Sequence, residues 1–82
     1  MQVAMVKFLD PTSHGNWASL DDVDKSEPRL CVAVGFLWED NADVVKVGLL
    51  ASRDDDGRES ASDWIVIPTG CVKSVRIIEE VD

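Results

Sequence analysis

The side chains that most often serve as nucleophiles or general bases are scarce in this sequence. His14 is the only histidine, and Cys31 and Cys71 are the only thiols. A thiol beside an imidazole can act as a nucleophile, but nothing in the spacing of these residues requires such a pair, and cysteines beside valines are usually buried and inert. They also lack the Cys-x-x-Cys spacing and the paired histidines of a zinc site. We therefore predict no catalytic residue, no metal, no cofactor and no enzyme activity.

The acidic run at residues 54–57 is a second candidate for chemistry. If Gly57 takes the sixth position of a calcium-binding loop, Ser52 becomes the first residue and Asp63 the twelfth, with aspartates at the third and fifth positions. The match is partial, because such a loop normally begins with aspartate, ends with glutamate and lies between helices. A solvated loop is the better interpretation of these acids.

The aromatic residues favour ligand binding more than catalysis. A small core needs only two or three of the five aromatic side chains, which leaves Trp17 and Trp38 less easily explained by packing. Flat aromatic side chains of this kind hold peptides and stacked bases. The competing interpretation of Trp17 is that it packs against one end of the fold.

Basic residues could converge on a small anionic ligand in two places. Lys73 and Arg76 lie three apart in the last predicted strand. Arg29 could meet Arg53 or Lys46 near the base of a central hairpin. Together with the aromatic residues and the loop around the histidine, the predicted ligand-binding residues are Trp17, Trp38, His14, Asn16, Arg29, Arg53, Lys73 and Arg76.

The net charge limits the choice of partner. Acidic residues outnumber basic ones 16 to 8, which gives a formal charge of −8. Proteins hold duplex nucleic acid by neutralising its phosphates with Lys and Arg, so direct duplex binding is not expected. The same acids could instead imitate the phosphates of DNA and occupy a host protein that binds nucleic acid, although acidic surfaces often serve solubility alone.

The length and composition indicate a small globular protein. We assign residues 1–82 to a single domain, because 82 residues allow only one small core. The first nine residues do not form a signal-peptide pattern, and the longest apolar runs fall far short of the roughly 20 residues that span a bilayer. We expect a soluble cytoplasmic protein with two packed thiols in a reducing compartment.

The clearest structural pattern is a hairpin over residues 30–52. Apolar residues alternate on both sides of a polar connection at residues 39–43, which is typical of two antiparallel strands and a tight turn. Gly35 and Gly48 interrupt the two strands and predict bends or close backbone contacts. The apolar run at residues 44–50 is an edge that must be covered or paired.

The flanking segments add three shorter strands at residues 3–8, 64–67 and 72–78. Pro11 ends the first strand, and residues 68–71 suit one 3₁₀ turn. Ser19 can cap a helical turn over residues 19–23, with Trp17, Leu20 and Val23 facing inward to close one end of the fold. The polar residues 53–63 are predicted to form an exposed connection.

This order of strands and turns is typical of an all-β, five-stranded SH3-like or Sm-like barrel with a long first loop. An OB-fold has the same number of strands but normally places a helix where residues 53–63 are too polar to form one.

The chain also resembles small uncharacterised proteins encoded by bacteriophages and prophages. The resemblance is carried by a first strand that ends near Asp10, the Trp-x-x-Leu element at residues 17–20, the strand at residues 31–37, an acidic turn and the Ile67–Pro68 pair. It implies an SH3-like barrel and a phage origin, but it implies no activity and no catalytic residues.

Three functions are compatible with these observations. The first is a non-enzymatic accessory binding protein that self-associates through strand edges and captures a small anionic ligand, such as a nucleotide signal, or a host component in evasion of host defence. The second is the acidic decoy described above. The third is an enzyme that uses His14 with an acid, and it is the least supported.

Overall fold

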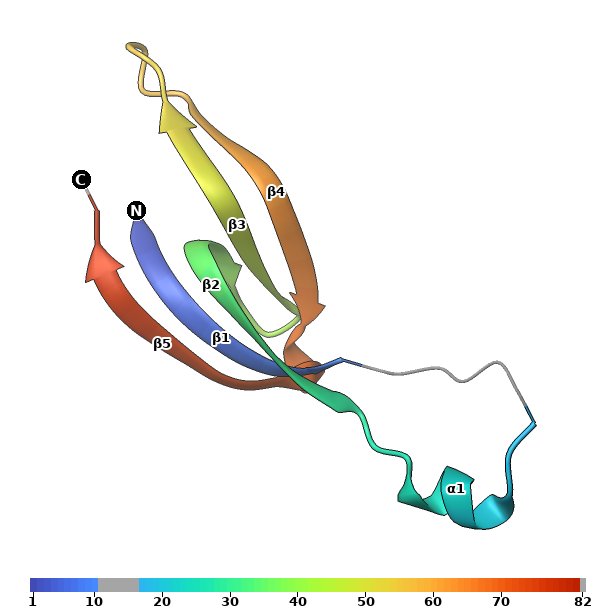
Figure 1. Cartoon of the computed structure of the whole chain (residues 1–82). Coiled ribbons are helices and arrows are strands. Elements are labelled where there is room, and N and C mark those ends of the chain that lie inside the picture. Colours follow the sequence, from blue (N-terminus) through green and yellow to red (C-terminus); the bar gives the residue numbers. More distant parts are fainter. Residues whose placement is uncertain (11–16, 82) are drawn as a thin grey trace.

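The computed structural model describes residues 1–10 and 17–81. Within them the chain forms five antiparallel strands, one short helix and one 3₁₀ turn (Figure 1). The predicted all-β architecture, including the 3₁₀ turn before the last strand, is confirmed. The elements in chain order are β1 (Gln2–Asp10), α1 (Leu20–Lys25), β2 (Arg29–Asp40), β3 (Val44–Arg53), β4 (Glu59–Pro68), η1 (Thr69–Cys71) and β5 (Val72–Glu80).

All five strands belong to one sheet with the order β4-β3-β2-β1-β5. The outermost strands, β4 and β5, do not pair with each other, so the sheet is open and the predicted closed barrel is not confirmed. The segment at residues 44–50, predicted to be an edge, lies in an inner strand, because β3 pairs with β2 on one side and with β4 on the other over most of this length. Only Leu49 and Leu50 lie beyond the last β2 partner.

The predicted turn between β2 and β3 is present and is organised by one side chain. The Asn41 side-chain oxygen accepts hydrogen bonds from the backbone N–H groups of Asp43, at 2.8 Å, and Val44, at 2.9 Å. Asparagine favours turns because its side chain can replace a backbone acceptor in this way. The Thr69 hydroxyl donates to the Asn41 carbonyl at 2.8 Å, which ties the turn to η1.

The core lies where the alternating apolar faces of β1, β3 and β4 meet. Because strand side chains alternate between the two faces of a sheet, every second residue of each strand points inward. The buried cluster consists of Val6, Phe8, Val45, Val47 and Ile67. Cys31 and Cys71 are half-buried free thiols that pack against it, as predicted for packed cysteines.

Two glycines allow the central strands to approach closely. A side chain at Gly35 would overlap the carbonyl oxygen of Gly48, and a side chain at Gly48 would overlap the indole of Trp38. The prediction of close contacts at these positions is confirmed. Gly35 also marks the position where β2 and β3 separate. The pairing of β2 with β3 begins only at the next residue, Phe36.

The helix forms where it was predicted but does not cover the sheet. The Ser19 hydroxyl caps it by accepting from the Asp22 N–H at 3.2 Å. Trp17, Leu20 and Val23 are 104%, 80% and 56% exposed, so the prediction that they close one end of the fold is wrong. Figure 1 shows the reason: α1 stands away from the sheet beyond the start of β2.

The polar segment at residues 53–63 is more regular than predicted. Its first half is a tight turn in which the Asp54 carboxylate accepts from the backbone N–H groups of Asp56 and Arg58. Its second half belongs to β4, which begins at Glu59 rather than near Trp64. Serines and alanine have low β propensity, but pairing along β3 supplies the ladder that holds residues 59–62 in a strand.

The described chain is elongated. Its principal extents are 58 × 22 × 19 Å and its radius of gyration is 16.5 Å, whereas a compact domain of this length has a radius of gyration of about 12 Å. The long β3–β4 hairpin projects at one end and α1 at the other (Figure 1).

Candidate functional site

The most distinctive feature of the sheet is a split between its two central strands. The pairing of β2 with β3 covers Phe36 to Asp40 and Val45 to Gly48. Beyond it, and among the residues that the structure describes, residues 29–35 of β2 pair only with β1, and residues 49–53 of β3 pair only with β4. We call the space between these diverging segments the fork, and we call residues 49–63, which form the outer half of the β3–β4 hairpin, the arm.

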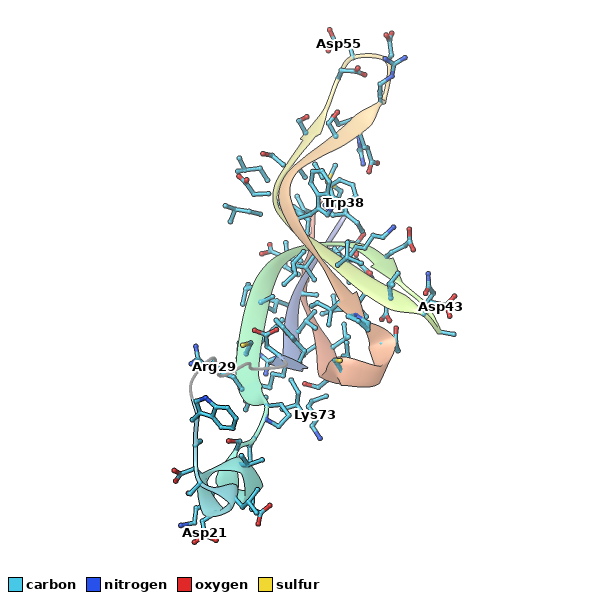
Figure 2. The ribbon with its side chains drawn as sticks, turned by 90° about the vertical axis from the view of Figure 1, so that its right-hand side faces the viewer. Asp21, Arg29, Trp38, Asp43, Asp55 and Lys73 are labelled. Atoms are coloured by element: carbon cyan, nitrogen blue, oxygen red, sulfur yellow. The ribbon has the colours of Figure 1, made fainter. Side chains whose placement is uncertain are left out.

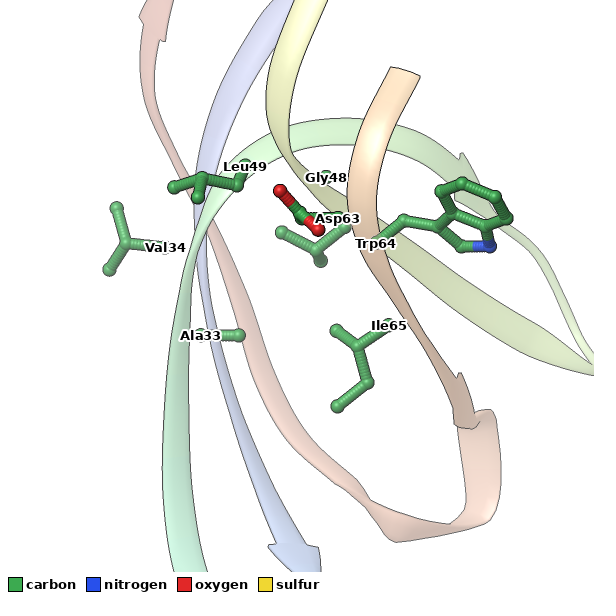
Figure 3. A pocket seen from close by; sticks show the side chains of 8 residues that line it. Ala33, Val34, Gly48, Leu49, Asp63, Trp64 and Ile65 are labelled. Carbon is green, nitrogen blue, oxygen red and sulfur yellow. The ribbon is translucent and has the colours of Figure 1, made fainter.

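A hollow of about 440 Å³ lies at the base of the fork (Figure 3). Its walls are mostly apolar, and Asp63 supplies the one carboxylate in its lining. Asp63 has a positive φ of 55°, a conformation that aspartate tolerates better than most residues. The lining residues are Ala33, Val34, Val47, Gly48, Leu49, Asp63, Trp64 and Ile65.

Large apolar side chains are exposed on both sides of the fork. On β2, Cys31 and Ala33 pack against the core, so Leu30, Val32 and Val34 point to the opposite face, where they are 60%, 54% and 52% exposed. On the arm, Leu49 and Leu50 are 62% and 57% exposed. Unpaired backbone groups and apolar side chains therefore occur together along both edges, a combination that favours pairing with another strand.

A second, smaller hollow of about 290 Å³ lies on the neighbouring surface of β2, β3 and β4 and is lined by Trp38, Lys46, Ala61 and Trp64. Because Gly48 has no side chain, the Trp38 indole can pack directly against its backbone. The indole Nε1–H is buried and has no acceptor within the described part of the chain. A buried donor without a partner is costly to the fold, and this one lies against Gly48.

The charge in the smaller hollow is already paired. The Lys46 ammonium lies 3.0 Å from a carboxylate oxygen of Glu39. Its hydrogen bond and positive charge lower the pKa of Glu39 below the ordinary value. An anionic ligand that uses Lys46 must therefore compete with an exposed carboxylate, which costs little because both groups are solvated.

The structure separates most of the predicted ligand-binding residues. Arg29 and Lys73 lie at the end of the sheet nearest α1, whereas Arg53 lies on the arm near Asp55, at the opposite end (Figure 2). Arg53 forms an ion pair with Glu59 at 3.0 Å. Arg29 therefore cannot converge with Arg53 within one chain.

The remaining predicted residues are also dispersed. Lys73 and Arg76 both lie on β5, and the register of β5 against β1 shifts at Lys73. Trp17 is fully exposed beside α1. Trp38 does line a hollow. His14 and Asn16 lie outside the described residues.

Sequence reasoning missed three residues of the fork, Leu49, Leu50 and Trp64. Two consecutive leucines break strict alternation, so one of them must point away from the core in any strand. That signal was present in the sequence. The role of Trp64 could not be predicted, because its position depends on β4 pairing with Gly48.

Acidic residues gather at the two ends of the molecule. Asp21, Asp22 and Asp24 lie on α1, and Asp54, Asp55 and Asp56 lie at the tip of the arm. Figure 2 shows Asp21 and Asp55 at opposite ends. Over residues 1–10 and 17–81, no three His, Cys, Asp or Glu residues are placed to hold a metal ion together.

No protein-family model matches this sequence, and neither a curated protein nor a solved structure shows significant similarity to it. In the described part of the chain, no helix is long and apolar enough to cross a membrane. What the geometry offers chemically is an apolar hollow between two free strand edges and an indole-lined hollow beside it, both suited to binding.

Proposed function

We propose that this chain is a non-enzymatic binding protein that works as a homo-oligomer. The observation that carries the proposal is the amount of apolar surface that the single chain leaves uncovered. Soluble monomers rarely expose large contiguous apolar patches, and such patches usually mark interaction surfaces. The exposed set includes five strand residues at the fork, Leu30, Val32, Val34, Leu49 and Leu50.

The open sheet supports self-association in a second way. No strand in the described part of the chain pairs with the outer edges of β4 and β5, and exposed sheet edges are templates for strand pairing. Five strands, two of them interrupted by a glycine, with a 3₁₀ turn before the last strand, are consistent with an SH3-like or Sm-like fold. Folds of the Sm-like type join subunits by strand addition, and the proposal extends strand pairing between subunits to the present chain.

The ligand in this proposal is a small, flat, anionic molecule such as a nucleotide. Trp38 and Trp64 line the same hollow and offer indole surfaces for stacking, an interaction that is tolerant of base identity. Lys46, which lines the same hollow, supplies a positive charge for such a ligand.

A phage-type accessory role in the bacterial cytoplasm, directed at a host signal or host component, completes the proposal and rests on the sequence resemblance. The acidic decoy is the alternative. The two acidic clusters at opposite ends of a 58 Å molecule favour it, because a decoy must present charge along an extended surface.

Native mass spectrometry of the protein purified from bacterial cytosol tests the proposal directly. We expect an oligomer, and any retained small molecule will appear as added mass. A bare monomer at about 100 μM, well above the dissociation constant of a stable complex, would contradict the oligomer. Binding of basic host proteins that weakens steeply with salt would favour the decoy instead.

The ligand is tested with a panel of nucleotides in a thermal shift assay. A ligand that binds only the folded state raises the melting temperature with concentration. We expect Trp38→Ala to abolish the shift and Trp17→Ala, which removes an exposed tryptophan outside the hollow, to preserve it. Equal loss in both variants, or no shift with any nucleotide, would contradict this ligand class.

A further inference from the structure

We propose that the fork of one copy receives the arm of a second copy, and that two copies exchange arms in a symmetric dimer. This inference rests on the proposed homo-oligomer and names the surface through which it forms. The occupant of the fork is thus a second copy of this chain, bound by strand pairing as well as by apolar contact.

The two free edges of the fork are complementary to each other. Residues 29–35 of β2 and residues 49–53 of β3 each have a ladder partner on only one side. Antiparallel pairing between them would satisfy the backbone groups of both edges. Apolar side chains flank both edges, so the same contact covers Val32, Val34 and Leu50.

Within one chain these edges cannot meet, because they diverge from Gly35 and Gly48. Figure 1 shows the arm running away from the first half of β2, and Figure 2 shows Asp55 at the tip of the arm and Arg29 at the other end of the sheet. A second copy, placed in the opposite direction, brings its arm to the first half of β2. By symmetry, the arm of the first copy then reaches the β2 of the second.

The existing β2–β3 ladder suggests the register of the exchange. Phe36 pairs with Gly48 and Leu37 with Val47. Continuing the same register outward, but with the arm of the second copy, places Val34 opposite Leu50. This arrangement keeps the two residues on the same face of the sheet, because directly paired residues of antiparallel strands share a face.

Charge favours the continued register over a register shifted by two residues. The continued register brings Arg29 opposite Asp55 in the acidic turn at the tip of the arm. A shift by two residues preserves the faces but places Arg29 opposite Arg53, where like charges repel. The basic start of β2 and the acidic tip of the arm are therefore electrostatically complementary between copies.

A charge exchange tests this contact. Arg29→Asp and Asp55→Arg should each weaken the dimer, by about tenfold in the dissociation constant, because each dimer contains the pair twice and exposed pairs contribute modestly. Mixing the two variants should restore association, since both contacts of the mixed dimer again join opposite charges. Analytical ultracentrifugation measures the three dissociation constants. As a control, Arg76→Asp alone should leave the dissociation constant unchanged, because Arg76 lies on β5.

A second pair of variants tests the apolar part of the contact. Leu50→Asp should weaken the dimer by more than tenfold, whereas Ile78→Asp, which changes a comparably exposed residue on β5, should leave it intact. Both side chains are exposed in the single chain, so both variants should keep the wild-type circular dichroism spectrum.

The outcomes separate this inference from the proposed function. If the wild-type chain is monomeric, the proposed homo-oligomer and the arm exchange both fail. If an oligomer forms but neither Leu50→Asp nor the charge variants affect it, the arm exchange alone is overturned. Dissociation by Ile78→Asp with Leu50→Asp unaffected would also overturn it, and would place the contact at the β5 edge. Dissociation without rescue on mixing would overturn the register.

Discussion

The arm and the rest of the sheet, which we call the base, share the strands β3 and β4, yet only the base has a core. In the base, Val45, Val47 and Ile67 are almost completely buried against β1. In the arm, the same two strands continue with Leu49 and Leu50 exposed. The apolar side chains of β3 are thus buried in the base and exposed to solvent in the arm.

The difference is the number of neighbouring strands. In the base, β3 has β2 on one side and β4 on the other, and β1 brings its apolar face to the core. In the arm, β3 and β4 have only each other. An isolated two-stranded hairpin is at best marginally stable in water, so we expect the arm to depend on a further contact while the base folds on its own packing.

Ile67→Ala is the largest expected effect and probes the base. Ile67 is 2% exposed, so truncation should leave a cavity and lower the free energy of unfolding by about 3 kcal/mol. The control Ile78→Ala, at a residue 46% exposed, should cost less than about 1 kcal/mol. Urea unfolding measures both. Similar losses would mean that the described core is not where stability resides.

Gly35→Ala comes next and probes the boundary between the two regions. The added Cβ meets the backbone of Gly48, which cannot move like a side chain, so we expect a loss of about 2 kcal/mol by the same unfolding measurement. Gly70→Ala is the matched control, because a Cβ there meets nothing within 4 Å. An unchanged stability of Gly35→Ala would show that β2 and β3 do not approach as described.

Gly57→Ala is a smaller effect confined to the arm. Gly57 has a φ of +82°, which costs a residue with a Cβ about 1 kcal/mol. We expect hydrogen exchange of arm amides to rise about fivefold, because arm opening is a local event. Amides of β1 should be unaffected. Equal acceleration in both regions would show that arm and base unfold as one unit.

The smallest effect is the pH dependence from Glu39. Because Lys46 lowers the folded-state pKa of Glu39 below its ordinary value of 4.5, the pair stabilises the fold above that pH. This contribution is lost as the pH falls through the lowered pKa. The melting temperature of Lys46→Met should therefore fall slightly less than that of the wild type as the pH is lowered from about 5 to about 3. A steeper decline in the variant would contradict the sign.

Much of the fold could be predicted because local patterns specify it. Alternation predicted the first strand and the central hairpin, and apolar runs predicted the last two strands. Asn41 and its neighbours predicted the central turn, and Ser19 predicted the helix start. The position of β4 was predicted less well, because Ser60 and Ser62 have no strand signal of their own. They become a strand by pairing with β3.

The candidate site was predicted only in part, because it joins residues far apart in the sequence. Trp38 was identified from its residue type and does line a hollow. The convergence of Arg29 with Arg53 was wrong, because β2 and β3 diverge at the fork instead of pairing along their whole lengths.

By itself, the sequence determined most of the extended segments, the turn between β2 and β3, and the presence of bends or close contacts at two glycines. These properties depend on residue types and spacings within a few positions of one another. Only the tertiary structure decided which strand edges remain free and which apolar faces remain exposed. The physical reason is that any neighbour can bury the apolar face of a strand and pair with its edge. Whether that neighbour exists in the same chain depends on the paths of strands that separate at Gly35 and Gly48.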